Sequence, residues 1–243
     1  MIFLDAVQSE FGTVVIGIDR ATGAQIYYHR GWCQSEADEH GISYAPYIHA
    51  MFGVIQQTPA VDVLMIGCGG GTLATLLSRT GRRVTVVDIN PAAIDLARSY
   101  FAMDGTVASF VADGMAWLAS ATEAFDCIVV DAFDGAEVPD HLCSAAFFAL
   151  VRRQLRPQGV VLMNVFEDKG GYHRADGIAA HLRGAGLTVK LLEEGIATDQ
   201  NVIVIGGPGS GPPQARPARL PRGRRRSVGA RPRPDALQGL TPQ

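Results

Sequence analysis

A glycine-rich turn and an acid at the end of the following strand are the residues of this 243-residue chain that most clearly predict chemistry. The turn, GCGGG at 67–71, follows the apolar run VDVLMI, and Asp88 ends the next apolar run about 20 residues later. Glycine lets backbone amides approach a ligand that a side chain would exclude. An acid at this spacing can accept bonds from two ribose hydroxyls. The pattern predicts a nucleoside-containing ligand held by Gly67, Gly69, Gly71 and Asp88.

More acids follow the next two expected strands. Asp113 with Gly114 comes after the first, and Asp131 and Asp134 lie in VVDAFDG after the second. Carboxyl ends of parallel strands meet at one edge of a sheet, where open α/β folds bind ligands. Asp113 precedes a helix, and a helix cap is the simpler explanation for it alone. Asp131 ends an apolar strand, where a charge is costly unless it is used. The pair therefore predicts a site for an amine, with one carboxylate accepting its proton.

Strands and helices alternate through most of the chain. The middle strands are continuously apolar, as strands buried on both faces of a parallel sheet are. A short connection before the last strand indicates that this strand runs antiparallel. The expected fold class is α/β, a Rossmann-like doubly wound sheet of seven strands. We expect strands at 61–66, 83–89, 107–112, 125–132, 159–166, 188–193 and 201–205, and helices at 72–79, 91–101, 115–120, 144–155 and 172–185.

The chain divides into three expected parts. Residues 1–56 form a small antiparallel β domain, a meander with strands at 12–19 and 24–29 and a turn or short strand at 31–34, and a linking helix at 44–56. Residues 57–206 form the nucleoside-binding transferase domain. Residues 207–243 hold eight of the 21 basic residues and one of the 24 acidic ones, with eight prolines, which predicts a disordered tail. No aromatic residue is interleaved with these arginines to stack on bases, so we expect no nucleic-acid partner.

Composition excludes several other classes of protein. No run of 18 apolar residues occurs, and the N-terminal MIFLDAVQSEFG has no basic flank and reaches Asp5 at once. We therefore expect no membrane span, no signal peptide and a cytoplasmic protein. The four cysteines are scattered without a C-x-x-C motif. This predicts reduced thiols and no metal site.

Long stretches of the chain resemble the spermidine synthase (polyamine aminopropyltransferase) family. They are VLMIGCGGGTLATLLSR, VTVVDINPAAIDLARSYF, VADGMAWL and FDCIVVDAFDGAEVPDHLCSAAFFALVRRQLRPQGVVLMNV. The Gly-x-x-Gln turn at 31–34 is similar too, and the resemblance covers about residues 10–206. It implies a small β domain before a Rossmann-like domain, decarboxylated S-adenosylmethionine as co-substrate, and transfer of its aminopropyl group to a small amine. It also suggests a homodimer.

The resemblance implies a role for each matching residue. Gln34 would touch the donor, and Asp88 the ribose. Asp113, followed by Gly114, would meet the adenine amino group. Asp131 would be the catalytic base, and Asp134 would help to hold the acceptor amine. In ISYAPYIHAM the family's Tyr-His-Glu motif has no clear match. Tyr44, Tyr47 and His49 are the candidates there, with Tyr44 taken as the substrate-binding residue.

One departure from the family keeps other functions open. Its members carry an acid inside the glycine turn that recognises the amine of the donor, and this chain has none there. Bare amides in the turn suit the α-carboxylate of S-adenosylmethionine instead, which favours a methyltransferase on the same scaffold as the alternative. A non-catalytic homologue that binds a polyamine or a nucleoside is a further alternative. An NAD-dependent dehydrogenase is disfavoured, because Thr72 replaces the third glycine of Gly-x-Gly-x-x-Gly.

Overall fold

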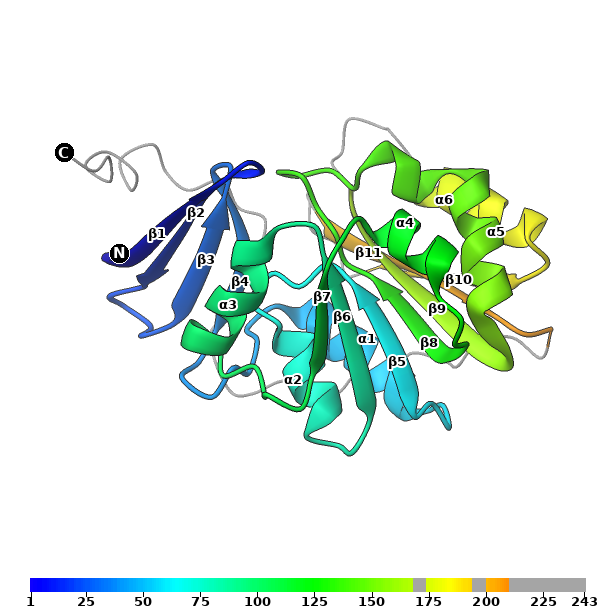
Figure 1. Cartoon of the computed structure of the whole chain (residues 1–243), viewed down its shortest axis with the longest axis horizontal. Coiled ribbons are helices and arrows are strands. Elements are labelled where there is room, and N and C mark those ends of the chain that lie inside the picture. The colour runs from blue at the N-terminus through cyan, green and yellow to red at the C-terminus, as the bar shows by residue number, and fades with distance from the viewer. Residues whose placement is uncertain (168–173, 194–199, 210–243) are drawn as a thin grey trace.

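The computed structural model describes residues 1–167, 174–193 and 200–209. In this part of the chain, a small N-terminal sheet lies beside a large sheet that is flanked by helices (Figure 1). Of the tail expected at 207–243, the residues from 210 onward lie outside the described part.

The large sheet has seven strands in the order β10-β11-β9-β8-β5-β6-β7. The pairs among β5 to β9 are parallel, whereas β11 is antiparallel to both of its neighbours. The predicted α/β class, with a Rossmann-like doubly wound sheet and an antiparallel last strand, is confirmed. The strands are β5 (Asp62–Ile66), β6 (Arg83–Asp88), β7 (Ala108–Val111), β8 (Phe125–Val130), β9 (Leu155–Glu167), β10 (Thr188–Glu193) and β11 (Gln200–Gly207).

Both faces of the large sheet are buried, which explains its continuously apolar strands. In β5, Val63 and Met65 pack on one face, and Leu64 and Ile66 pack on the other. Helices α1 (Pro46–Gln56), α2 (Thr72–Ser78) and α3 (Pro91–Tyr100) contribute to the first core. The second core takes side chains from α4 (Gly114–Ser120), the 3₁₀ helix η1 (Asp140–Cys143), α5 (Ala145–Gln154) and α6 (Arg174–Gly184).

The small sheet is an antiparallel meander in the order β1-β2-β3-β4. Its first strand was not expected from the sequence, because the consecutive apolar residues Ile2, Phe3 and Leu4 show no alternation of apolar and polar positions. In the structure all three are exposed. The sheet packs against helix α3 through a small core that includes Ile16 and Phe101. Its strands are β1 (Ile2–Ser9), β2 (Gly12–Ile18), β3 (Gln25–His29) and β4 (Trp32–Ala37).

The carboxyl ends of β5 and β8 approach each other very closely. The Asp131 amide donates to the Ile66 carbonyl at 2.9 Å, and the chain then turns at Gly67 with φ of 96°. A Cβ at Gly67 would lie 2.2 Å from the Asp131 carbonyl oxygen. Only glycine combines this backbone angle with this contact.

Replacing Gly67 by alanine should therefore destabilise the fold by about 2–4 kcal/mol, since backbone has to move. Gly81 is a matched control, because it has φ of 83° but nothing within 4 Å of its Cβ position. Gly81→Ala should cost only about 1 kcal/mol. Urea unfolding of both variants measures the difference. Equal losses would show that the contact with Asp131 is unimportant.

Candidate active site

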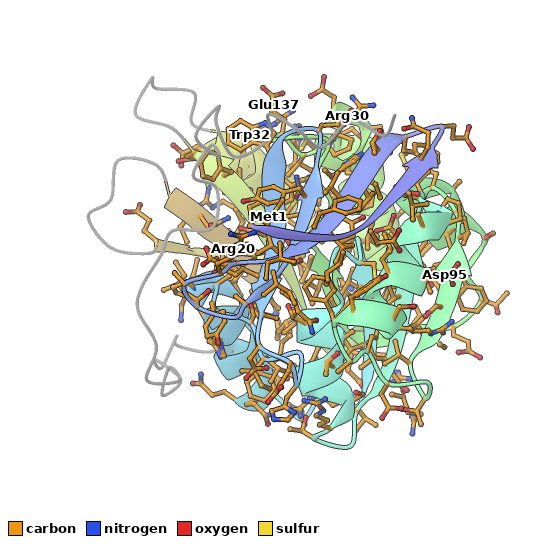
Figure 2. All side chains as sticks on the ribbon, turned by 90° about the vertical axis from the view of Figure 1, so that its left-hand side faces the viewer. Met1, Arg20, Arg30, Trp32, Asp95 and Glu137 are labelled. Carbon is orange, nitrogen blue, oxygen red and sulfur yellow. The ribbon has the colours of Figure 1, made fainter. Side chains whose placement is uncertain are left out.

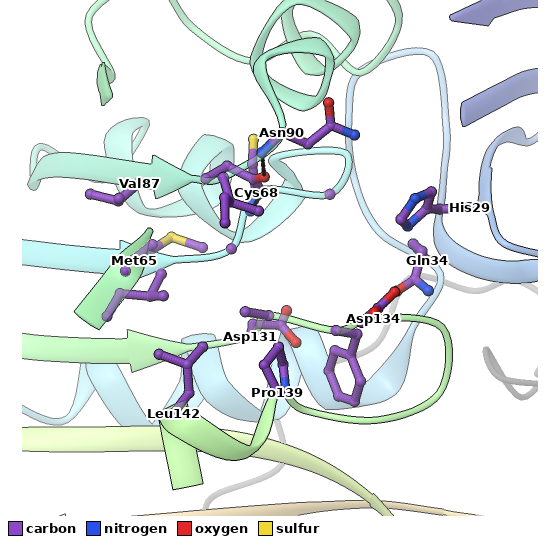
Figure 3. A pocket seen from close by; sticks show the side chains of 18 of the residues that line it. His29, Gln34, Met65, Cys68, Val87, Asn90, Asp131, Asp134, Pro139 and Leu142 are labelled. Carbon is purple, nitrogen blue, oxygen red and sulfur yellow. Dashed lines mark hydrogen bonds between the residues drawn. The ribbon is translucent and has the colours of Figure 1, made fainter. Parts of the chain in front are cut away.

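A pocket of about 230 Å³ lies beyond the carboxyl ends of β5, β6 and β8, with room for more than a few waters. The N-terminal sheet covers one side of it through His29, Arg30, Gln34 and Ser35. Figure 3 shows Asp131 in the middle, between Leu142 and the pair Gln34 and Asp134. The lining includes most residues that the sequence predicted for a site, namely Gln34, Gly67, Gly69, Asp88, Asp113, Gly114, Asp131 and Asp134.

The amides of the glycine turn are largely engaged within the protein. The expectation of a turn with bare amides is therefore wrong, because carbonyls and side chains from other parts of the chain accept hydrogen bonds from the turn. Among these five amides, in the part of the chain that the structure describes, only that of Gly69 has no such bond. The amides of Gly67, Cys68, Gly70 and Gly71 donate to the Val87 carbonyl, Asp88 carboxylate, Ser35 Oγ and Cys68 carbonyl, at 2.8, 2.7, 2.9 and 2.7 Å.

Gly71 has a structural position at the end of this turn. It is the N-cap residue of α2 with φ of 64°, and a Cβ there would lie 2.6 Å from the Met103 sulfur. Its α position therefore faces the protein core near α3, not the pocket. Gly71 is outside the pocket lining, unlike Gly67 and Gly69.

Asp88 joins the turn to the end of β6. Its two carboxylate oxygens accept bonds from the Cys68 and Asn90 amides at 2.7 and 2.8 Å. Burial raises the pKa of Asp88, and these two bonds oppose the rise by favouring the anion. The carboxylate is thus fixed at the pocket wall, with lone pairs left for the hydroxyls of a sugar.

Asp113 has two partners in the structure. One oxygen caps α4 by accepting from the Ala116 amide at 2.8 Å, and the other lies 2.8 Å from His141 Nε2. His141 also lines the pocket, as the sequence predicted for the loop after β8. The neighbouring Gly114 has no space for a side chain, since a Cβ would lie 2.3 Å from Ile66 Cγ2. Asp113 therefore both caps helix α4 and lines the pocket.

Asp131 is held by amides from two other strands. Asn164 Nδ2 on β9 donates to its Oδ1 at 2.9 Å, and Asn201 Nδ2 on β11 donates to Asn164 Oδ1 at 3.0 Å. The bond from Asn201 fixes which end of the Asn164 amide faces the carboxylate. Tyr47 Oη lies 3.5 Å from the other oxygen. Burial raises the pKa of Asp131 to about 6, although the bonds from Asn164 and Tyr47 lower it.

Asp134 lies at the solvent side of the same pocket. It forms an ion pair with Arg30, whose Nη1 is 3.0 Å from Oδ1, and both side chains are half exposed. Beside it, Gln34 Nε2 donates to the Gly135 carbonyl at 2.8 Å. The two contacts join the β3–β4 turn and strand β4 to the loop after β8, at the end of the molecule where Figure 2 labels Arg30, Trp32 and Glu137.

Tyr47 lines the pocket, whereas Tyr44 does not. Tyr44 lies before α1 and donates its amide to the Glu36 carbonyl at 2.9 Å. Helix α1 begins at Pro46, so Tyr47 is in its first turn and faces Asp131. Sequence reasoning could not separate two tyrosines three residues apart, because the choice depends on where the helix begins.

Known proteins resemble this chain in sequence. Residues 63–159 match the model of a family described as a methyltransferase domain. A probable polyamine aminopropyl transferase of Bifidobacterium longum is 35% identical over 108 residues, or 44% of this chain and 24% of that protein. The polyamine aminopropyltransferase of Chromobacterium violaceum is 36% identical over 124 residues, or 49% of this chain and 48% of that protein.

The resemblance to the spermidine synthase family is confirmed. A probable spermidine synthase from Corynebacterium glutamicum has the same fold, with a TM-score of 0.75 at 19% identity over 85% of this chain and 81% of that one. A spermidine synthase in complex with the transition state analogue AdoDATO has a TM-score of 0.66 at 19% identity, over 87% and 75% of the two chains. The present chain spans about half or less of the length of the two curated relatives.

Two absences hold for the described part of this chain. None of its helices has the length and apolar character needed to cross a membrane. No group of three or more His, Cys, Asp or Glu side chains there is arranged to hold a metal ion.

The raised pKa of Asp131 predicts a pH-dependent stability. The folded state binds this proton more tightly than the unfolded state, where the pKa is about 3.9. The contribution is therefore present below about pH 4 and is lost as pH rises through about 6. Relative to Asp131→Asn, the wild type should lose about 1–3 kcal/mol of unfolding free energy between pH 4 and pH 7.

Denaturant titrations at several pH values measure this difference. The variant itself is the control, because a change in packing shifts its stability by the same amount at every pH. Parallel pH curves for the two proteins would contradict the raised pKa.

Proposed function

We propose that this chain is an aminopropyltransferase that moves the aminopropyl group of decarboxylated S-adenosylmethionine to a small amine. The observation that carries the proposal is Asp131, a carboxylate of raised pKa that Asn164, itself bonded by Asn201, holds in the pocket with the glycine turn and Asp88. The named relatives support this choice of reaction. The spermidine synthase in complex with AdoDATO, which has the same fold, supports it too.

The proposed reaction needs a neutral amine. Its lone pair attacks the methylene carbon beside the sulfonium, a C–N bond forms, and the C–S bond breaks. The electron pair of that bond goes to sulfur, which leaves as the thioether of methylthioadenosine. Asp131 accepts the proton that the amine gives up, and a base with a pKa near 6 can hold and release that proton near neutral pH.

The remaining residues would position the two substrates. Asp88 would accept from the ribose hydroxyls, and Asp113 from the adenine amino group, with its carboxylate fixed by His141 and α4. Gly67, Gly69 and Gly114 would present backbone to the donor along the pocket wall. Gln34, Tyr47 and Asp134 would surround the acceptor amine and the donor arm.

The methyltransferase alternative loses one of the two features that suggested it. The turn has no acid, but it is not a turn of bare amides for a carboxylate, because four of the five amides at 67–71 are bonded within the protein. The match to a methyltransferase domain fits the fold that both classes of enzyme share. The expectation of a cytoplasmic protein rests on composition and that of a homodimer on the family resemblance, and light scattering tests the dimer.

A product assay by mass spectrometry tests the reaction. The protein is incubated with decarboxylated S-adenosylmethionine and a panel of diamines and polyamines, and we expect an aminopropylated amine together with methylthioadenosine. Calorimetry with methylthioadenosine is the companion measurement. Binding without any product would favour the non-catalytic alternative, and absence of both would overturn the proposal.

Asp131 and Asn164 should affect the rate in different ways. Asp131→Asn should lower kcat by about two to four orders of magnitude with little change in donor affinity, because it removes only the base. Asn164→Leu removes a bond that stabilises the Asp131 anion, so the rising limb of the pH–rate profile should move from about pH 6 to higher pH. Unchanged kcat in the first variant, or an unchanged profile in the second, would remove the residue from the mechanism.

A further inference from the structure

The hydroxyl of Ser35 occupies the space beside the glycine turn into which a turn side chain would project. A Cβ at Gly69 would lie 3.0 Å from Ser35 Oγ, whereas a Cβ at Gly70 would meet the Phe101 ring at 2.9 Å and Ser35 Cβ at 3.0 Å. Ser35 Oγ accepts from the Gly70 amide at 2.9 Å, which leaves its own proton for another acceptor. Ser35 comes from β4 of the small sheet, and it lines the pocket together with Gly69.

This part of the pocket is available to the charged end of the donor arm. The turn contacts the proposed ribose site, because the Cys68 amide donates to Asp88. The adjacent Gly67 contacts the proposed base, because a Cβ there would lie 2.2 Å from the Asp131 carbonyl oxygen. The reactive carbon is bonded directly to the sulfonium, so the rest of the arm extends beyond that carbon, and Gly69 and Ser35 line the same pocket as Asp88 and Asp131.

The polar groups of Ser35 and Gly69 are neutral, and together they can bind either a carboxylate or an ammonium group. The Ser35 hydroxyl has a proton for a carboxylate and a lone pair for an ammonium, and the Gly69 amide is a further donor. An acid at this position would repel a carboxylate at close range and favour a cation. The neutral pair therefore tolerates a donor arm that carries a carboxylate.

We propose that the same site also uses S-adenosylmethionine itself as a donor, transferring a 3-amino-3-carboxypropyl group, with Ser35 as the residue that permits it. The inference rests on the proposed function, since the reactive methylene carbon is the same in both donors. The amine lone pair forms the C–N bond to that carbon, the C–S electron pair goes to sulfur, and methylthioadenosine leaves. Asp131 takes the proton from the amine, and the carboxylate of the arm stays intact beside Ser35.

The first test is the product of the wild-type protein with S-adenosylmethionine and the best amine acceptor. We expect an amine that carries the aminopropyl group plus one carboxyl group, with methylthioadenosine as co-product. Product from the decarboxylated donor but none from S-adenosylmethionine would overturn this inference and leave the proposed function intact. A methylated amine with S-adenosylhomocysteine would overturn both, and no product from either donor would overturn the proposed function.

The second test compares Ser35→Asp with Ser35→Asn, which have similar shapes and differ in charge. Both can accept from the Gly70 amide, so melting curves should show two folded proteins. Ser35→Asp should lower kcat/KM for S-adenosylmethionine, relative to the decarboxylated donor, by about 10–100-fold. Ser35→Asn should change that ratio by less than about threefold, since charge alone is the cause. Equal shifts in the two variants would overturn the role of Ser35.

Calorimetry gives a readout that does not depend on turnover. The same pair of variants should bind methylthioadenosine alike, because that ligand has no charged arm. Ser35→Asp alone should weaken binding of S-adenosylmethionine. Loss of methylthioadenosine binding in Ser35→Asp would show that the substitution damages the nucleoside site, and would count against the proposal.

Discussion

The close contact between the Gly67 backbone and the Asp131 carbonyl is the constraint on which the rest of the site depends. It sets the carboxyl ends of β5 and β8 side by side, so a ligand that lies on the glycine turn also lies against the residue after β8. The Cys68 amide extends the same unit to Asp88 at the end of β6. Strands β5, β6 and β8 thereby place the glycine turn, Asp88 and Asp131 on one wall of the pocket. The contacts between these residues fix their relative positions.

The second constraint is the docking of the small sheet on helix α3. Phe101, at the end of α3, is fully buried and packs against Tyr27 of β3, with ring centroids 6.4 Å apart. Because β4 pairs with β3, this packing also fixes Ser35 over Gly70 and Gln34 beside Gly135. A sheet of four strands thus completes a pocket that the large sheet leaves open on one side.

The sequence predicted the features that arise locally. Apolar strands buried on both faces, the turn at 67–71, and the cap Asn90 before Pro91 are properties of short stretches, and the structure has each of them. It missed Asn201 and Ser35, whose positions depend on contacts across the fold. Asn201 reaches Asp131 only through Asn164, which is 37 residues earlier in the chain. Nothing near an asparagine or a serine in the sequence indicates such a partner.

The same distinction applies to the charges of the proposed mechanism. Two carboxylates three residues apart, as the sequence has them, would each disfavour ionisation of the other if they shared one site. The structure separates them, because Arg30 pairs with Asp134 at the solvent side while Asp131 turns inward to Asn164. Burial raises the pKa of Asp131 and the hydrogen bonds from Asn164 and Tyr47 lower it, so that this pKa is about 6. A carboxylate set in this way is ionised at neutral pH yet basic enough to take a proton from an amine as it reacts, whereas Asp134 is paired with Arg30 at the solvent side.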